Sequence, residues 1–154
     1  MGLSRLMYRI TGFAGLTGLY VKSKSHSQSM EKEIITSKII ACAYKVHNTL
    51  GAGFLEKVYE RAYKIELEKS GFKVENQIPL SVYYDDQVVG NYFADLLIND
   101  EIIIELKAIE SLTKSHEIQL VHYLNAIKKD FGLLINFGSS VQIKRKYRIY
   151  KKTH

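Results

Sequence analysis

The segment IIIELK, residues 102–107, restricts the possible folds of this chain more than any other feature of the sequence. Its run of isoleucines and leucine is typical of a buried β-strand, yet Glu105 and Lys107 interrupt it. A charge removed from water without a partner is costly, so such residues usually have a partner or a chemical role. Residues two apart on a strand point to the same face, which places this charged pair beside Ile103 on one face of an apolar strand.

Hydrophobic periodicity gives the order of the elements around this strand. Helical spacing is found over residues 32–50, 54–70 and 113–128. Strand-like segments cover residues 72–86, 87–98, 101–109, 131–138 and 141–150. The sequence therefore predicts an α/β fold with a central mixed sheet, which contains an antiparallel three-strand meander and is flanked by helices. The only proline, Pro79, is expected on an edge strand.

Charge is distributed unevenly along the chain. Residues 1–29 carry four basic and no acidic side chains, residues 30–143 carry 12 Lys and Arg against 16 Asp and Glu, and residues 144–154 carry six basic side chains. We expect a disordered or targeting-like extension over residues 1–29, and one domain with a basic tail over residues 30–154. Met30, where the periodic sequence begins, is a candidate start of translation. The basic ends could attract phosphates or simply keep the chain solvated.

The sequence shows no clear sign of membrane insertion or secretion. No apolar run approaches the roughly 20 residues that a bilayer-spanning helix needs. The single Cys42 lies in an apolar helical pattern and cannot form an internal disulfide, so we expect a buried, inert thiol. These features favour a reducing compartment, and we expect a cytoplasmic protein without a membrane partner.

The loop between the second and third predicted strands decides whether Asp95 can join Glu105. A three-residue loop, Asn99–Glu101, pairs Ile98 with Ile102 and sets Asp95 opposite Glu105, with Cβ atoms about 4.5–5.5 Å apart. A two-residue turn would instead point Asp95 away from Glu105. We predict the three-residue loop or an equivalent bulge.

An acidic pocket at this point would suit a hard divalent cation. Asp95 and Glu105 offer the oxygen ligands that Mg²⁺ prefers, and Lys107 could orient a water or stabilise charge on a phosphate. A third carboxylate is expected from the second helix. Its predicted apolar face consists of Leu55, Val58, Tyr59, Ala62, Tyr63 and Ile65. Glu56 lies at the margin of this face, and Glu60 lies further out. We therefore favour Glu56.

The third predicted helix carries a polar stripe. His116, Gln119 and Tyr123 are three and then four residues apart, so they lie on one side of the helix and could face the same pocket. Each also has a structural interpretation. His116 fits a surface position at the helix N-terminus, and the other two could be polar groups satisfied at a domain surface.

Structural alternatives also exist for the remaining candidates. Glu105 and Lys107 could form a cross-strand salt bridge on a solvated face, and Glu56 could be an exposed helical glutamate. The 11 tyrosines could stack on bases, but most fit the apolar faces of helices and strands. We expect most tyrosines to lie in the core.

Several segments together resemble a known family. GFLEKVY, residues 53–59, has the Gly-x-x-Glu-x-x-Tyr pattern of the GxxExxY proteins, and the strings YFADLLINDEIIIELKAIE, HEIQLVHYLNA and GLLINFGSS extend the resemblance over residues 31–146. These proteins are grouped with the PD-(D/E)xK nuclease superfamily. The resemblance implies a restriction-endonuclease-like core, with Mg²⁺ or Mn²⁺ held by Asp95 and Glu105 and with Lys107 as the motif lysine. Ala94 stands where the motif name has proline.

The resemblance also assigns the helical residues. It implies that Glu56 is the additional acidic ligand of such nucleases, and that Gln119 with Tyr123 forms the Gln-x-x-x-Tyr element of their exonuclease-type branch. The six expected catalytic residues are Glu56, Asp95, Glu105, Lys107, Gln119 and Tyr123.

Two functions from different classes follow. The first is a metal-dependent phosphodiesterase that hydrolyses a nucleic-acid backbone, with DNA favoured over RNA as the partner. The second is a catalytically silent module that keeps the fold and binds nucleic acid or a protein partner, with a homodimer as one arrangement.

Overall fold

Residues 14–149 are described in this computed structural model, with side chains from residue 27 onward. The helices are α2 (Ala14–Leu50), α3 (Glu56–Lys69) and α4 (Lys114–Ala126). The strands are β1 (Val74–Tyr84), β2 (Gln87–Ile98), β3 (Ile102–Lys107), β4 (Phe131–Phe137) and β5 (Val141–Tyr147). Contacts divide the chain after Lys38 into two compact units, and each unit is described by itself. The sheet and the candidate site belong entirely to the second unit.

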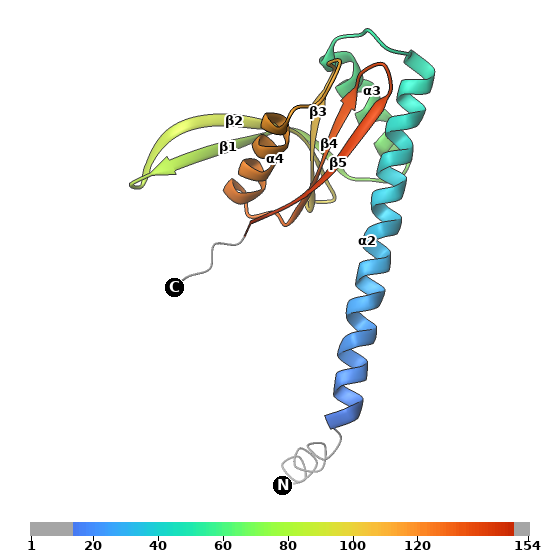
Figure 1. The fold of residues 1–154 in the computed structure, drawn as a ribbon, viewed down its shortest axis with the longest axis vertical. Coiled ribbons are helices and arrows are strands. Elements are labelled where there is room, and N and C mark those ends of the chain that lie inside the picture. The colour runs from blue at the N-terminus through green and yellow to red at the C-terminus, as the bar shows by residue number, and fades with distance from the viewer. Residues whose placement is uncertain (1–13, 150–154) are drawn as a thin grey trace. The chain divides into compact units, whose positions relative to one another are not determined.

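The order of elements predicted from hydrophobic periodicity is confirmed (Figure 1). The main difference concerns the first helix, which begins at Ala14 rather than near residue 32. Its N-terminal half lacks the regular apolar spacing on which the prediction relied, so periodicity alone missed it. Residues 14–29 of the expected extension are therefore helical, and residues 1–13 lie outside the described part. The division of the chain into an extension and a domain at residue 30 stays a prediction.

The five strands form one mixed sheet in sequential order, from β1 to β5. Only the β3–β4 pair is parallel, and α4 provides the crossover between these two strands. The other pairs are antiparallel, so β1, β2 and β3 form the predicted meander. β1 is an edge strand, as expected from Pro79, which lacks a backbone N–H.

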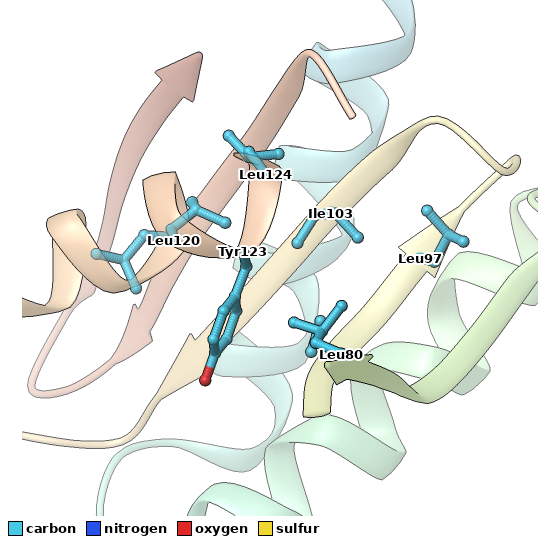
Figure 2. Close-up of a cluster of buried hydrophobic side chains, with 8 residues drawn as sticks. Leu80, Leu97, Ile103, Leu120, Tyr123 and Leu124 are labelled. Carbon is cyan, nitrogen blue, oxygen red and sulfur yellow. The ribbon is translucent and has the colours of Figure 1, made fainter. Parts of the chain in front are cut away.

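Helix α4 covers one face of the sheet. Its Leu120 and Leu124 belong to a buried cluster with Ile103 of β3, to which the β1–β2 hairpin adds Leu80 and Leu97 (Figure 2). Burying these side chains removes a continuous apolar area from water, which is the main driving force for placing α4 here. The cluster therefore fixes α4 over the strands that carry the candidate site.

Helix α3 and the last turns of α2 cover the opposite face. The ring of Tyr59 stacks on Phe137 of β4 with centroids 4.7 Å apart, and the ring of Tyr63 meets Phe137 edge-on at 5.8 Å. The buried Tyr63 hydroxyl donates to the carbonyl oxygen of Ile39 in α2 at 2.8 Å. Cys42, also on this part of α2, is buried as predicted.

The apolar face of α3 is rotated relative to the prediction. Leu55, Val58 and Ile65, which were expected on the buried side, are exposed. The buried side consists of Tyr59, Glu60, Tyr63 and Leu67. The large tyrosine rings determine which face of α3 is packed against the sheet. The prediction from the sequence treated the tyrosines and the smaller apolar residues as equal contributors to that face.

The tyrosines do not lie mostly in the core, so that prediction is wrong for the described residues. Three of them are buried: Tyr59, Tyr63 and Tyr123. Five are exposed: Tyr44, Tyr83, Tyr84, Tyr92 and Tyr147. Three of these exposed rings lie on the β1–β2 hairpin, which in Figure 1 extends beyond α4 and therefore leaves part of its surface uncovered.

Among the described residues 14–149, none of the helices combines the length and apolar character that crossing a bilayer requires.

Gly132 of β4 allows α4 to approach the sheet closely. A Cβ at this position would lie 2.9 Å from the carbonyl oxygen of Ile103, and 3.0 Å and 3.3 Å from side-chain atoms of Leu120 and Leu124. We expect Gly132→Ala to lower the free energy of unfolding by about 1–3 kcal/mol, because the neighbouring strand cannot move aside. Chemical denaturation measures this change. The exposed Ser140→Ala is the control, and an equal stability of both variants would contradict the prediction.

Candidate functional site

The loop between β2 and β3 has the predicted register. Ile98 pairs with Ile102, Leu97 with Ile103 and Leu96 with Ile104, so Asn99–Glu101 is a three-residue loop. Asn99 and Asp100 have positive φ angles of 50° and 59°, which these residue types tolerate better than most. The loop thus brings Asp95 beside β3, as the sequence predicts.

Strand β2 separates from β3 at Asp95. Their pairing ends at Leu96 and Ile104, and the backbone N–H of Leu106 donates instead to Asp95 Oδ2 at 2.8 Å. The side chain of Asp95 therefore takes the place of the missing strand partner. Ala94 and Leu97 both join the cluster under α4 although they are three residues apart, so the alternation of β2 is interrupted between them. This irregularity sets the direction of the Asp95 side chain.

Glu105 and Lys107 form the charged pair of β3. The Glu105 side chain is only 4% exposed, and its Oε1 accepts a hydrogen bond from Lys107 Nζ at 2.8 Å. Glu105 Oε2 is buried and has no hydrogen-bond partner among the described residues. A salt bridge on a solvated face, the structural alternative for this pair, does not fit this burial. The unpartnered oxygen leaves one strong acceptor available for a ligand.

Burial and neighbouring charge both act on Glu105. Burial raises the pKa of its carboxyl group most, the charge of Asp95 raises it further, and the opposing effect of Lys107 leaves the pKa at about 7. The pKa of Asp95 is also raised, mainly by burial, although the hydrogen bond from Leu106 and the charge of Lys107 lower it. The carboxyl groups of Asp95 and Glu105 therefore bind a proton more tightly than exposed carboxyl groups do, because both are shielded from water and repel each other when charged. A metal cation could take the place of that proton.

Glu56 enters the site from the first residue of α3. It is half-buried, and burial is the main reason for its raised pKa, with an opposing effect of Lys107 and a smaller contribution from Asp95. Burial acts to lower the pKa of Lys107, but its hydrogen bond to Glu105 and the three acidic charges raise it overall. Glu56, Asp95, Glu105 and Lys107 therefore lie near enough to influence one another's charge, whereas their roles as site residues stay a prediction.

Tyr59 holds the loop that delivers Glu56. Its hydroxyl donates to the carbonyl oxygen of Gly51 at 2.5 Å and accepts from the backbone N–H of Phe54 at 3.3 Å. Gly53 has a φ of 101°, which strongly favours glycine. The segment GFLEKVY therefore combines a glycine bend, the Glu56 carboxylate and a tyrosine that fixes the bend to α3.

This arrangement predicts the effect of removing the Tyr59 hydroxyl. We expect Tyr59→Phe to keep the ring stack on Phe137 but to lose both loop hydrogen bonds, which lowers the free energy of unfolding by about 1–2 kcal/mol. Thermal or chemical denaturation tests this expectation. Tyr44→Phe, at an exposed site on α2, is the control, and equal effects of the two substitutions would contradict the role given to Tyr59.

The polar stripe of α4 divides into two parts. Gln119 Nε2 donates to the Tyr123 hydroxyl at 2.7 Å. Burial raises the pKa of Tyr123, and the charge of Glu105 adds to this effect, which places the ring close to the acidic pair. His116 instead accepts a hydrogen bond from the backbone N–H of Thr113 at 3.1 Å and caps the helix, in agreement with its structural interpretation.

Glu60 is the main residue that sequence reasoning missed. It was expected further out than Glu56, but it is only 5% exposed. Lys57 Nζ donates to both of its oxygens at 2.8 Å, and Gln77 Nε2 donates to one of them at 3.3 Å. Its charge contributes to the raised pKa of Asp95 after the larger effect of burial. The rotation of α3 explains the error, because it turns Glu60 toward the sheet.

Asn136 is a second missed residue. It is fully buried on β4, opposite Lys107, and its side chain exchanges two hydrogen bonds with the backbone of Ile109 at 2.8 and 2.9 Å. These bonds fix the chain just after Lys107. A single asparagine in the apolar segment FGLLINFG was the signal that could have indicated this role.

A hollow of about 590 Å³ adjoins the site on the side of Glu56. The loop before α3, the segment after β3 and the end of β4 form its walls, and Glu56, Ala108 and Gly138 are among the lining residues. Space for a ligand thus reaches Glu56 from this side.

The donor set suits a divalent cation that keeps part of its water shell. Glu105 Oε2 is unpartnered and buried, and Asp95 lies close enough to raise the pKa of Glu105. Among the described residues, no three His, Cys, Asp or Glu side chains are grouped so that they alone could hold an ion. Mg²⁺ commonly uses one or two carboxylates together with waters and substrate phosphate, so two protein ligands fit it.

A model described as the PD-(D/E)XK nuclease superfamily matches residues 33–148. The chain belongs to this superfamily. The resemblance described from the sequence and the fold class are thereby confirmed, whereas membership of the narrower GxxExxY group stays a prediction. Nucleases of the PD-(D/E)XK superfamily generally use divalent metal ions.

Solved structures give more distant likenesses. The crystal structure of SSO0001 matches with a TM-score of 0.49 and 17% identity, over 62% of this chain and 51% of that chain. An alkaline exonuclease, LHK-Exo from Laribacter hongkongensis, matches with a TM-score of 0.45 and 12% identity, over 60% of this chain and 55% of that one. The chain spans about half the length of each. No curated protein sequence matches the chain.

Proposed function

We propose that this member of the PD-(D/E)XK nuclease superfamily is a metal-dependent nuclease that hydrolyses phosphodiester bonds. The observation that carries the proposal is the buried, unpartnered Oε2 of Glu105, which lies beside Asp95 and Lys107. Structural ion pairs seldom leave such an oxygen unsatisfied, because the desolvation cost is not offset. A ligand that binds this oxygen would remove that cost.

Asp95 and Glu105 would hold the ion, Mg²⁺ or Mn²⁺, with Glu56 as a further acidic residue that binds it through water. When bound, such an ion supplies Lewis-acid activation of the phosphate and a more acidic water. Leu106 N–H keeps Asp95 in position through its hydrogen bond. Hence the ligand pair is organised before the ion binds.

Lys107 carries the positive charge that the reaction needs beside the phosphate. Its ammonium group is held by Glu105 Oε1 at 2.8 Å, and its raised pKa keeps it protonated at neutral pH despite the opposing effect of burial. From this position it can orient a water and stabilise the negative charge that develops on the phosphate. Gln119 and Tyr123, joined by their hydrogen bond, supply donors on the α4 side.

Cleavage of labelled DNA and RNA tests the proposal. Single-stranded and duplex forms of both are incubated with Mg²⁺, with Mn²⁺ or with EDTA. We expect cleavage that requires the ion and that falls on the order of 100-fold or more in Lys107→Ala. Lys114→Ala, at an exposed position of α4, is the control. Absence of cleavage on every substrate by the purified, folded wild-type protein would refute the proposal.

A second candidate is a catalytically silent module that binds a protein partner. Exposed apolar side chains on the β1–β2 hairpin favour it, including Tyr83, Tyr84, Val89 and Phe93. A second copy of the chain is one such partner, which analytical ultracentrifugation detects. In that case the cleavage experiment gives no product with either wild type or Lys107→Ala.

A further inference from the structure

A groove of about 510 Å³ runs between α4 and the β1–β2 hairpin. The hairpin side includes Tyr92, and the α4 side includes Ser115, Ile118, Gln119, His122 and Tyr123. This volume is within the range of pockets that hold small organic groups. None of the side chains that line it is Asp, Glu, Lys or Arg, so the groove suits a group without formal charge.

Two aromatic rings form one corner of the groove. The centroids of Tyr92 and Tyr123 are 6.2 Å apart and their planes are inclined by 42°. Tyr92 is 49% exposed, so its ring has surface available for stacking. A Cβ on Gly90 would lie 2.9 Å from Cε2 of Tyr92, which means that the absence of a side chain at Gly90 leaves room for the ring.

The groove and the candidate catalytic site share two residues on α4. Gln119 and Tyr123 line the groove and are hydrogen-bonded to each other at 2.7 Å. In Figure 2 the ring of Tyr123 extends away from Leu124, with its oxygen at the far end. A ligand that spans both places would have its charged part at Glu105 and Lys107 and an uncharged, flat part beside Tyr92.

A nucleotide has these two parts, a charged phosphate and a planar uncharged base. A base within a duplex is covered on both faces by its neighbours and cannot stack on a protein ring, whereas a base of a single strand can. The same groove, which has no Lys or Arg in its lining, offers little to a phosphate.

We propose that the groove between α4 and the β1–β2 hairpin binds an unpaired nucleobase, which stacks on Tyr92 while its phosphate lies at the carboxylate site. The inference rests on the proposed nuclease function and adds its substrate class, a single strand or a frayed end. Gly90 has a positioning role, because it allows the Tyr92 ring to lie where the base needs it.

Fluorescence of short oligonucleotides that contain 2-aminopurine tests this proposal, since stacking on an aromatic ring quenches the fluorophore. Binding is measured in the Lys107→Ala background with Mg²⁺ and, in parallel, in the wild-type chain with EDTA. We expect quenching with single strands, and roughly tenfold weaker binding after Tyr92→Ala. Gly90→Ala is expected to reduce quenching, and Tyr92→Phe to preserve it.

Tyr83→Ala is the matched control, because Tyr83 is an exposed hairpin tyrosine outside the groove lining. Circular dichroism verifies that each variant is folded. The proposal is overturned if no quenching occurs under either condition, or if Tyr92→Ala and wild type show equal quenching. It is also overturned if Tyr92→Ala weakens binding of a blunt duplex as much as it weakens binding of a single strand. Tyr92-dependent stacking without any cleavage by wild type would leave the groove in place and refute the nuclease. Cleavage at the same rate by wild type and Tyr92→Ala would support the nuclease and refute the role of the groove.

Discussion

Asp95→Asn is expected to lower metal-dependent cleavage by on the order of 100-fold or more and to weaken Mg²⁺ binding to a similar extent. Asparagine keeps the shape of the side chain and one oxygen that can accept from the Leu106 N–H, so the sheet should remain intact. What it loses is the negative charge beside Glu105. Cleavage assays measure the rate, and calorimetric titration with Mg²⁺ measures the binding.

Asp100→Asn provides the comparison for this variant. Asp100 is an exposed carboxylate in the loop that follows β2, and it pairs with Lys73 rather than with the site. Its substitution should leave cleavage and ion binding close to wild type. If Asp95→Asn cleaves as fast as Asp100→Asn, Asp95 is not a metal ligand. A loss of folding in Asp95→Asn would instead show that its charge is needed by the sheet.

The second large effect concerns pH and Glu105. Its pKa in the folded chain is about 7, raised first by burial and then by Asp95, against a value of 4.5 for an unburied glutamate. The native state therefore retains a proton that the unfolded chain releases between about pH 4.5 and pH 7. The free energy of unfolding of the metal-free protein should fall as pH rises through this interval, by on the order of 1–3 kcal/mol.

Glu105→Gln should remove this decrease, because glutamine does not ionise. We expect the metal-free variant to be more stable than metal-free wild type at pH 8 and similar to it at pH 5. Mg²⁺ should stabilise wild type at pH 8 and have little effect on Glu105→Gln. Denaturation curves at several pH values test these expectations, with the exposed Glu101→Gln as the control. Parallel pH profiles for wild type and Glu105→Gln would contradict them.

Much of the site could be predicted because it depends on local rules. Alternation along β3 placed Glu105 and Lys107 on one face, and loop length fixed the register that brings Asp95 to them. The hydrogen bond between Gln119 and Tyr123 follows from their separation of four residues on one helix. Each of these inferences needs only the period of one element or the length of one turn.

The features that were missed depend on tertiary packing. Glu60 is buried because the rings of Tyr59 and Tyr63 set the rotation of α3, and a helical pattern does not reveal which apolar residues dominate the contact. The exposure of Tyr83 and Tyr84 depends on how far the hairpin extends beyond α4, which no local pattern encodes. The interrupted alternation of β2 at Asp95 belongs to the same class, since it appears only when β2 and β3 separate.

The separation of β2 from β3 at Asp95 also limits which substitutions can be tolerated at this position during evolution. Because Asp95 replaces a backbone partner for Leu106, its loss would leave a buried N–H unsatisfied in the middle of the sheet. A relative of this chain that does not catalyse cleavage would therefore be expected to keep an acceptor such as asparagine at this position, while substitutions of Lys107 would be tolerated more readily. Among relatives without activity, we therefore expect fewer residue types at the position of Asp95 than at the position of Lys107.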